Sequence, residues 1–536
     1  MLPVLTGSQM AQLDRYTIDH LGLDGKILMS SAARETLRVI RQVYPDVRKP
    51  VIFAGTGNNG GDGVALAYYA QQDGMSPVLV LCHPQFADPP QLSEDSAYFY
   101  RIAERAYVNI RLLDNPALAP ELVMGPQCDL VVDALFGTGL SRELGEYHRQ
   151  LIDRLNYVEQ PLLAVDCPSG LNCTNGQVMG TALEADLTVT MGFPKLGFFH
   201  PDAGRYLGDL HVVRLGFAPP SEAAIEPDAH AWPDALWEPL TQPRAANTHK
   251  GDYGKLLVVA GHRRYPGAPR LAAAAAARSG AGLVRLVVPE DVYPMLAGLP
   301  AVMTDSHPTD GQGGFNAQPS PELLEYLHWA DALVLGPGLS DTPGPLALAH
   351  RLLTERDLPV LVDADGLRAL PVETGGHDWP LVLTPHVGEL ARLAGQGAQA
   401  VLDDWFEVCL ETARQHDALV LAKCNQCLLA TPEGAVIFPQ RGHPALASGG
   451  TGDVLSGIAG ALLARYHAAA RQLPGATPAQ AAKHRLVAAE IIASAVNIHA
   501  QAARLGVCRL SEDALSAADL PDLIPAAVAR LAGHGD

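Results

Sequence analysis

A glycine-rich turn near the N-terminus holds the first residues that could do chemistry, with the sequence GTGNNGGDG over residues 55–63. It follows an apolar run and opens a helical stretch, so main-chain N–H groups at the helix start are suited to bind an anion. A Rossmann dinucleotide site would need an acidic residue about 20 positions on, where the second strand instead ends in a Cys-His-Pro segment, 82–84. The side chains of Asn58, Asn59 and Asp62 therefore favour amide and carboxylate contacts over a plain Rossmann turn.

Two further expected strand ends carry polar residues, in VVDALFGTG over 131–139 and VDCPSG over 165–170. The carboxyl ends of parallel strands face one crevice, so these side chains can converge there. A single aspartate at a strand end is commonly a helix cap or a turn former, but three such ends favour a site. Amide, carboxylate and hydroxyl oxygens suit a hard cation rather than zinc. The converging residues are Asn58, Asn59, Asp62, Asp133, Asp166 and Ser169.

The strongest motif in the chain is SGGTGDVLSG over residues 448–457, which runs into an Ala-rich helical stretch, 458–465. Its glycines let main-chain N–H groups approach an anion at a helix start, and Asp453 is placed to act on a hydroxyl group near that anion. This pattern predicts phosphoryl-transfer chemistry. It is not a Walker P-loop, because no Gly-Lys-Ser/Thr follows, and the alternative is a simple loop and helix cap.

Three more motifs in this half of the chain each follow an expected strand: GPGL at 336–339, DADG at 363–366 and TPHVGE at 384–389. His386 alone could be a buried or helix-capping histidine. Its position beside Pro385 and Glu389, at the expected mouth of the sheet, favours a substrate contact instead.

The elements that position these motifs form two α/β domains. Short β-branched and Leu-rich runs alternate with Ala-rich stretches, as in βα units around a mostly parallel sheet. Six prolines between residues 217 and 244 interrupt regular structure, so we predict a first domain at 1–218, a connection at 219–243 and a second domain at 244–536. The clearest predicted strands are 51–54, 78–82, 130–132, 162–165, 256–260, 284–288, 332–335, 360–362, 381–383 and 419–421.

Composition limits the possible partners and the location. The 536 residues carry a net charge of -20, which would repel a phosphate backbone or anionic lipid, so we expect no nucleic-acid or membrane partner. The Ala/Leu stretch 271–277 is far short of the roughly 20 apolar residues of a spanning helix, and no secretory signal is evident. We place the protein in the cytoplasm.

The eight cysteines are too sparse for a disulfide scaffold and are compatible with reduced thiols. The pair Cys424 and Cys427 has the spacing of a redox or zinc motif, but the chain has no second such pair. We therefore interpret them as two packed thiols.

The first half of the chain closely resembles NAD(P)H-hydrate epimerase domains. The resemblance rests on GNNGGDG, DALFGTG, VDCPSG, Pro194-Lys195 and the later Gly208-Asp209-Leu210, and it implies a Rossmann-like three-layer fold. One departure is LMSSAA at 28–33, where the family usually has LMExAG. The resemblance implies a potassium site at Asn59, Asp133 and Ser169. It also implies contacts to the hydrated cofactor from Asn58, Asn59, Gly60, Gly61, Asp62, Gly137, Thr138, Gly139, Leu140, Ser141, Arg142, Glu143 and Asp166.

The second half resembles the ribokinase-like group, and specifically the ADP-dependent NAD(P)H-hydrate dehydratases, over about 246–503. The chain departs from the family with KCNQC at 423–427, where KGxxT is common, and with GHP at 442–444, where GNP is frequent. The resemblance implies Asp453 as the catalytic residue. It also implies contacts to the hydrate from Ala268, Gly338, His386 and Asp453, and contacts to the nucleotide from Lys423, Cys424, Asn425, Gln426, Cys427 and Gly452.

Both halves thus resemble partners in one repair pathway for hydrated nicotinamide cofactors. The first domain would interconvert the R and S hydrates, with Asp166 as our candidate for the residue that gives and takes the proton. The second would dehydrate the S form at the expense of ADP, or of ATP. The expected cofactors are potassium and magnesium ions, the expected substrates are NADHX and NADPHX, and we expect a homo-oligomer.

Two alternatives remain open from the sequence. The chain could be a ribokinase-like small-molecule kinase, acting on a hydroxymethylpyrimidine or a sugar, fused to a nucleotide-binding module. Alternatively, the first half could be a non-catalytic nucleotide sensor or partner-binding module. A net phosphorylated product would identify the kinase, and direct epimerisation by the first domain would exclude the sensor.

Overall fold

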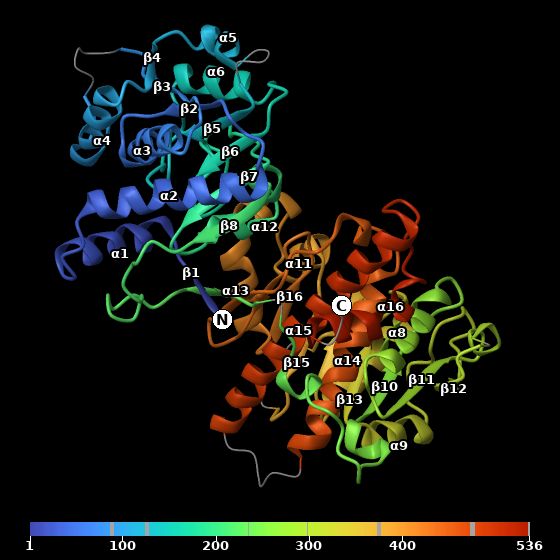
Figure 1. Ribbon diagram of the computed structural model, residues 1–536. Coiled ribbons are helices and arrows are strands. Elements are labelled where there is room, and N and C mark those ends of the chain that lie inside the picture. Colours follow the sequence, from blue (N-terminus) through green and yellow to red (C-terminus); the bar gives the residue numbers. More distant parts are fainter. Residues whose placement is uncertain are drawn as a thin grey trace. The chain divides into compact units, whose positions relative to one another are not determined.

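The structure is a computed structural model that describes residues 1–85, 91–123, 128–233, 235–296, 298–371, 377–471 and 478–533. The chain divides into two compact units, Leu2–Ala229 and His230–Asp536, with Met1 grouped with the second. Figure 1 shows both as α/β units. The division lies inside the proline-rich segment 219–243.

A parallel sheet forms the centre of the first unit, with the strand order β4-β3-β2-β5-β6-β7-β8. Counting from β2, the first six strands in chain order have the order 3-2-1-4-5-6 of a Rossmann sheet. The order reverses between β2 and β5, and ligands bind beyond the carboxyl ends of strands at such a point. The strands are β2 (Pro50–Ala54), β3 (Val78–Cys82), β4 (Asn109–Leu113), β5 (Leu130–Ala134), β6 (Leu162–Val165), β7 (Leu187–Met191) and β8 (Asp209–Val213), and the short β1 (Leu2–Val4) precedes them.

Helices cover both faces of this sheet and make three layers. Ile52 and Val132 pack with α2, α3 and α4 on one face, while Phe53 and Val131 pack with α5 and α6 on the other. The strands are therefore buried on both sides, as their uninterrupted apolar sequences require. The helices of this unit are α1 (Gly7–Asp19), α2 (Gly25–Val43), α3 (Asn58–Gln72), α4 (Glu94–Arg105), α5 (Ala119–Val123), α6 (Glu146–Leu155) and α7 (Gly204–Leu207).

The second unit is built on a mixed sheet whose parallel part runs in the order β16-β15-β14-β13-β10-β11-β12. Strands β17 and β18 continue it beyond β16 as antiparallel neighbours. The strand order reverses between β10 and β13. The strands are β9 (Ala229–Ala231), β10 (Lys255–Val259), β11 (Leu283–Pro289), β12 (Met303–His307), β13 (Ala332–Leu335), β14 (Val360–Val362), β15 (Leu381–Leu383), β16 (Leu419–Ala422), β17 (Leu428–Ala430) and β18 (Val436–Phe438).

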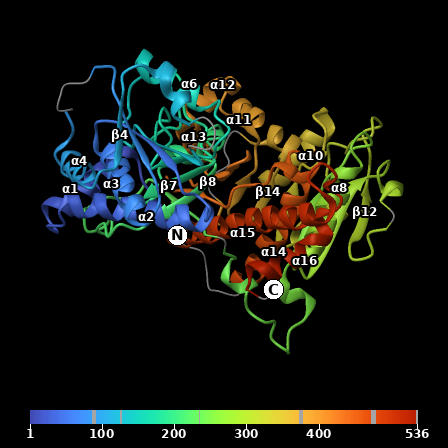
Figure 2. The same cartoon turned by 45° about the horizontal axis from the view of Figure 1, so that its top comes forward.

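Four helices, α8, α14, α15 and α16, pack together on one face of this sheet in a single apolar core. Figure 2 shows α14, α15 and α16 in orange and red, lying side by side. The helices of this unit are α8 (Gly267–Arg278), α9 (Pro321–Trp329), α10 (Pro343–Thr354), α11 (Val387–Leu393), α12 (Ala398–Asp403), α13 (Trp405–Gln415), α14 (Thr451–Ala470), α15 (Pro478–Leu510) and α16 (Leu520–Leu531).

Helix α15 is the one described helix that meets the length and composition criteria for a membrane span. Its stretch Ala481–Leu510 is long and apolar enough to cross a membrane, although no such segment was expected. In the folded chain, 83% of its most apolar window is buried, as in the core helix of a soluble protein.

The polar side chains of α15 bind the main chain of the segment that begins the second unit. Asn497 is fully buried and its Nδ2 donates hydrogen bonds to the carbonyl oxygens of Pro233 (2.9 Å) and Ala235 (3.1 Å). The main-chain N–H of Trp237 donates to Ser494 Oγ at 2.6 Å. These bonds satisfy buried polar groups at both ends and fix the irregular segment to the helix.

Candidate active sites

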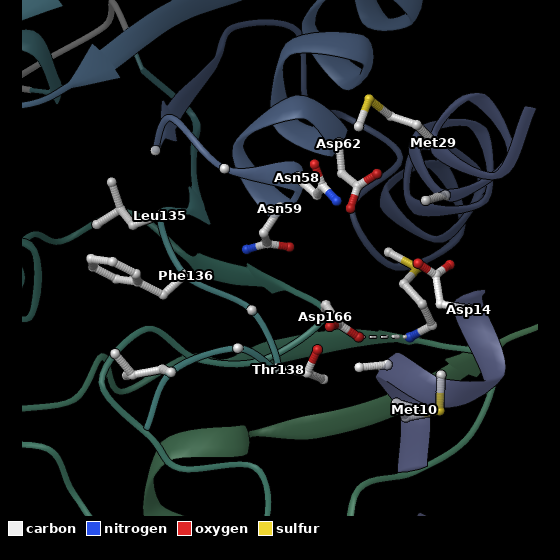
Figure 3. Close-up of a pocket in the computed structure, with 18 of the residues that line it drawn as sticks. Met10, Asp14, Met29, Asn58, Asn59, Asp62, Leu135, Phe136, Thr138 and Asp166 are labelled. Atoms are coloured by element: carbon white, nitrogen blue, oxygen red, sulfur yellow. Dashed lines mark hydrogen bonds between the residues drawn. The ribbon is translucent and has the colours of Figure 1, made fainter. Parts of the chain in front are cut away.

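A cavity of about 680 Å³ lies at the carboxyl edge of the first unit's sheet, at the point where the strand order reverses. Figure 3 shows the residues around it. The turn after β2, the loop after β5 and the residue after β6 line one side, and α1 and α2 close the other. Of the residues predicted for the hydrated cofactor, ten line this cavity: Asn58, Asn59, Asp62, Gly137, Thr138, Gly139, Leu140, Ser141, Arg142 and Asp166.

Asp166 is held in one orientation by contacts to a single carboxylate oxygen. Its Oδ1 accepts hydrogen bonds from Lys195 Nζ at 2.5 Å, from the Met191 main-chain N–H at 3.2 Å and from Thr190 Oγ1 at 3.3 Å. Its φ of +66° is in the left-handed region, which aspartate tolerates better than most residues. The other oxygen, Oδ2, faces the Gly137 loop, since a Cβ added at Gly137 would lie 3.3 Å from it.

Lys195 is fully buried, and its ammonium group donates to three acceptors: Asp166 Oδ1, Thr190 Oγ1 at 2.6 Å and the Met191 carbonyl at 3.0 Å. A buried ammonium group needs such partners, because an isolated charge out of water is strongly destabilising. Lys195 therefore fixes the position of the Asp166 carboxylate.

Two more carboxyl groups face the same cavity, and both hold their protons more tightly than usual. Burial raises the pKa of Asp62 well above its ordinary value, and the charges of Asp166 and Asp14 raise it further. Burial also raises the pKa of Asp14, followed by the charges of Asp166 and Asp95. The cavity thus combines an ion-paired carboxylate with carboxyl groups able to donate a proton, a combination suited to acid–base chemistry. Figure 3 shows Asp14, Asp62 and Asp166 directed toward the same space.

Three of the predicted contacts lie elsewhere. Glu143 is exposed and does not line the cavity. Gly60 and Gly61 are buried in the first turn of α3, where the chain packs too closely for a side chain. A Cβ at Gly61 would lie 2.3 Å from Ser96 Oγ, and one at Gly60 would lie 1.9 Å from the Gly55 carbonyl oxygen. These two glycines therefore shape the turn that carries Asn58, Asn59 and Asp62.

Replacing Gly60 with alanine is expected to destabilise the first unit by about 1–3 kcal/mol, because a main-chain atom would have to move. The matched control is Gly57→Ala in the same turn, where a Cβ meets nothing within 4 Å and the loss should be about 1 kcal/mol or less. All five tryptophans lie in the second unit. A thermal transition that circular dichroism detects and tryptophan fluorescence does not therefore reports unfolding of the first unit. Equal midpoints for the two variants would contradict this packing.

The residues predicted for potassium form a buried oxygen-rich group beside the cavity. Asp133 is fully buried and accepts hydrogen bonds from Ser169 Oγ (2.7 Å), the Ser169 main-chain N–H (2.8 Å) and the Leu135 main-chain N–H (3.0 Å). Burial raises its pKa to about 6. Among the described residues, no cation pairs with Asp133, and both polar atoms of the Asn59 amide are buried without a hydrogen-bond partner. A hard cation would satisfy both groups.

The second site lies at the start of α14, which has the left-handed Gly450 (φ +93°) as its N-cap and no side-chain cap. An uncapped helix start offers its main-chain N–H groups to an anion. Asp453 lies in this first turn, and its pKa is raised to about 7 by burial first and by the charge of Asp363 second, while Lys423 acts in the opposite direction. Asp453 can therefore both hold and release a proton near neutral pH.

Lys423 follows β16 and reaches the same helix start. Its Nζ forms an ion pair with Asp363 Oδ1 at 2.5 Å, and a Cβ added at Gly452 would lie 3.4 Å from that Nζ. Of the other residues predicted for the nucleotide, Cys424 is half-buried and Asn425 is exposed. Gln426 and Cys427 are buried, and Gln426 Nε2 donates to the Pro439 carbonyl at 2.9 Å, so these two side chains face the interior.

The residues predicted for the hydrate gather at the second sheet's reversal point and beside β15. Gly338 has φ +59°, and a Cβ there would lie 2.9 Å from the Ala268 side chain, so the two residues are adjacent. His386 caps α11: its Nδ1 accepts from the Gly388 main-chain N–H at 3.0 Å. His386 therefore has a capping role, and its Nε2 lies 3.5 Å from Glu389 Oε1. The side chain is still 59% exposed, so the ring is accessible to a substrate.

All eight cysteines are free, and no group of three or more His, Cys, Asp or Glu side chains able to hold a metal occurs in the described ranges. Of the pair predicted to be packed thiols, Cys427 is buried and Cys424 is half-buried.

The sequence interpretation missed two residues of the first site. Lys195 was noted only as part of a motif, and Asp14 was not considered. Asp14 lies one turn from Met10 and one turn from Ile18 on α1, and all three line the cavity. A lone acid in the apolar stripe of an amphipathic helix was the available signal.

Comparison with known proteins matches both halves of the chain. A family model described as YjeF-related protein N-terminus matches residues 25–197, and one described as NAD(P)H-hydrate dehydratase matches residues 256–513. A protein of Salinibacter ruber called bifunctional NAD(P)H-hydrate repair enzyme Nnr is 34% identical over 99% of this chain and 97% of its own. The Escherichia coli protein of the same name is 34% identical over 84% of this chain and 83% of its own.

Among solved structures, the ADP/ATP-dependent NAD(P)H-hydrate dehydratase from Bacillus subtilis, co-crystallised with ATP and Mg²⁺, is similar to this chain. It is 28% identical, with a TM-score of 0.44, and the match covers 55% of this chain and 98% of that one.

Proposed function

This chain belongs to the family of bifunctional NAD(P)H-hydrate repair enzymes, and from that membership we propose how its two sites divide the work. The chain is an enzyme: an NAD(P)H-hydrate epimerase, which is an isomerase, joined to an NAD(P)H-hydrate dehydratase, which is a lyase. One observation carries the assignment of the sites. In each unit, an acidic side chain with a raised pKa, Asp62 or Asp453, lies near the start of an uncapped helix that follows a parallel strand.

In the first unit, the reaction inverts the carbon that bears the 6-hydroxyl group. Asp62, whose pKa is raised well above its ordinary value by burial, gives a proton to the departing hydroxyl, which leaves as water while the ring nitrogen supplies electrons. Asp166 accepts a proton through Oδ2 from the water that adds to the other face, and Lys195 keeps the carboxylate in place. Because the reaction is reversible, each residue performs the reverse transfer in the other direction.

In the second unit, the 6-hydroxyl of the S hydrate attacks the terminal phosphoryl group of ADP, and the bond from that phosphorus to the bridging oxygen breaks, which releases AMP. Asp453 removes the hydroxyl proton, and the N–H groups of Thr451 and Gly452 with the Lys423 ammonium group stabilise the transferred phosphoryl group. The lone pair of the ring nitrogen then expels phosphate as the C6–O bond breaks. The resulting iminium ion loses its C5 proton to the departing phosphate, which restores the C5=C6 double bond of the dihydronicotinamide. We propose ADP as the phosphoryl donor, with ATP as the alternative.

We further propose a potassium ion at Asn59, Asp133 and Ser169. The residues fit a hard cation because the Asn59 amide is unpartnered and the buried Asp133 carboxylate lacks a counter-charge among the described residues. A bound ion would supply positive charge next to the loop that follows β5. Ser169 and Asp133 order that loop, since the Phe136 main-chain N–H donates to Ser169 Oγ at 2.9 Å.

Potassium is therefore expected to stabilise the first unit, by about 1.4 kcal/mol when its concentration is ten times the Kd. The shift should appear in the circular dichroism transition and not in tryptophan fluorescence, which follows the second unit in the same sample. Lithium at equal ionic strength controls for salt effects. The variant Asp133→Asn should lose the potassium shift, and a shift of the same size in that variant would remove Asp133 from the site.

Magnesium is expected to enter with the nucleotide. Mg²⁺ is usually held by substrate phosphates and one or two carboxylates rather than by a complete protein cage. The lack of any His, Cys, Asp and Glu cluster of that kind in the described ranges fits this mode of binding.

A mixture of R and S hydrates with K⁺, Mg²⁺ and ADP tests the proposal, with dihydronicotinamide absorbance followed near ~340 nm. Both activities predict complete conversion, faster than spontaneous epimerisation in an enzyme-free control. Conversion that stops at the S fraction would contradict the epimerase site. Accumulation of a phosphorylated product, seen by phosphorus NMR, would favour the small-molecule kinase instead.

We also propose that the enzyme acts in the cytoplasm as a homo-oligomer. Ile27 of α2 and Tyr98 of α4 are exposed apolar side chains that line the same surface pocket, and the proposal is that a second copy buries them. Light scattering from the purified chain tests this, and a mass of 56.8 kDa at micromolar concentration would contradict it.

A further inference from the structure

Asp363 is a buried carboxylate with an anchoring partner at each oxygen. It follows β14, and its side chain is only 2% exposed. Its Oδ1 accepts from Lys423 Nζ at 2.5 Å and its Oδ2 accepts from Ser456 Oγ at 2.7 Å. The two partners come from different elements, Lys423 from the end of β16 and Ser456 from α14. One side chain therefore ties a strand end to a helix.

Both hydrogen-bond partners of Asp363 lie in or beside the first turns of α14. Ser456 lies three residues after Asp453 and so on the same side of the helix. The Lys423 ammonium group lies beside Gly452, where a Cβ would be 3.4 Å from Nζ and 3.9 Å from Asp363 Oδ2. The main-chain N–H of Lys423 also donates to the Pro385 carbonyl at 2.8 Å, which fixes its base. Asp363 thus controls where the flexible end of Lys423 and the start of α14 meet.

We propose that Asp363 is a positioning residue of the dehydratase site, which anchors the Lys423 ammonium group and Ser456 so that this cation and the start of α14 meet one phosphoryl group together. The inference rests on the proposed roles of Asp453 and Lys423. It adds a residue that acts through these groups rather than on the substrate. A long lysine side chain would otherwise sample many rotamers, and holding it in one geometry lowers the entropy lost on binding.

The charge of Asp363 also acts on Asp453. Burial is the largest cause of the raised pKa of Asp453, and the negative charge of Asp363 is the second. The positive charge of Lys423 lowers this pKa. Lys423 is itself faced by Glu389 of α11 and His499 of α15, besides Asp363 and Asp453. Replacing Asp363 by a neutral residue removes a negative neighbour of Asp453 and leaves the positive one. The pKa of Asp453 should then fall.

We therefore expect Asp363→Asn to change two properties together. A general loss of stability would not change both of them in this way. The KM for ADP should rise by about 10- to 100-fold, because a charge-assisted contact loses its anchor. The acidic limb of the pH profile of kcat, set by ionisation of Asp453, should move to lower pH. Steady-state rates at several pH values and ADP titration by calorimetry measure both properties.

Asp331→Asn is the matched control. Asp331 is also fully buried and paired with residues of α14 and its end, with His467 Nδ1 at 3.3 Å and Arg471 Nη1 at 2.7 Å. His467 lies 14 residues after Asp453, about 21 Å along the helix. Loss of this carboxylate should lower stability without moving the KM for ADP or the pH profile. The same pH shift in both variants would overturn the inference.

Ser456→Ala provides a second test if Asp363→Asn does not fold, as judged by tryptophan fluorescence. This variant keeps the Asp363–Lys423 ion pair and removes the tie to α14, so we expect a KM increase of about 3- to 10-fold. An unchanged KM for ADP and an unchanged pH limb in the folded variants would overturn the positioning role. The proposed function fails separately, if Asp453→Ala retains the wild-type rate.

Discussion

Replacing Asp453 with alanine is expected to lower ADP-dependent dehydration of the S hydrate by about 10²–10⁴-fold, the usual contribution of a general base. Asp453 is the acidic side chain in the first turn of α14, and the 6-hydroxyl proton must leave as the phosphoryl group arrives. Asp453→Asn should lose as much, because the amide keeps the size of the side chain but cannot take the proton. Epimerisation of the R form should persist in both variants because it belongs to the first unit, and unchanged tryptophan fluorescence shows that the second unit is folded.

The pH dependence gives an independent check on Asp453. Since its pKa is raised to about 7, the wild-type rate should rise with pH through that value as the base form appears. The same shift affects stability: the folded state binds this proton more tightly than the unfolded state, so the contribution is present below the unfolded pKa and is lost as pH rises through about 7. Asp453→Asn should therefore melt higher than wild type at pH 8 but not at pH 4. An Asp453→Ala or Asp453→Asn variant that keeps most of the wild-type dehydration rate would refute the assignment of Asp453 as the general base.

The second large effect is expected for Asp166→Asn, which should slow epimerisation by about 10²–10⁴-fold while dehydration of pure S hydrate continues. The amide would still fill the space beside Lys195, but it would neither accept the proton nor balance the buried ammonium group. Chiral chromatography of the hydrates, with the dehydratase kept inactive by omission of ADP, measures the rate directly.

Asp186→Asn is the control for Asp166. Asp186 precedes β7 at the opposite edge of the same sheet, where its Oδ2 accepts from the Leu162 main-chain N–H at 2.8 Å. Its replacement should leave epimerisation unchanged. If both variants are equally slow, the effect of Asp166→Asn reflects sheet stability, and if neither is slow, Asp62 or Asp14 must carry the proton transfer.

The sequence predicted most inner strands of both sheets, because these strands are buried on both faces and read as short apolar runs. Examples are β13 (Ala332–Leu335) and β6 (Leu162–Val165), which match their predicted bounds. It did not predict the buried inner strands β7 and β17. Edge strands were missed: β4 has the sequence NIRLL and is largely exposed, and β12 has the sequence MTDSH and is mostly half-buried. An edge strand can carry polar residues because one side of its hydrogen-bonding edge has no neighbour, so its pattern is weak.

Site residues at strand ends were also predictable, since the turn after a parallel strand must lie at the ligand edge of the sheet. Contacts made by distant or fully buried groups were not. Asp14 approaches the cavity from a helix near the N-terminus, and Asp363 was known only as part of a motif. Which of two neighbouring side chains faces inward, as Gln426 does and Asn425 does not, depends on packing that no local pattern encodes.

The hydrogen bonds from α15 to the segment that begins the second unit determine where the chain can be cut. A dehydratase fragment that starts at residue 244, the predicted domain start, would lack the carbonyls of Pro233 and Ala235 and the main-chain N–H of Trp237. Asn497 and Ser494 would then be buried without these partners in the middle of a long apolar helix, exposing that helix to aggregation. A fragment intended for separate expression should therefore begin no later than residue 230, at the division between the two units.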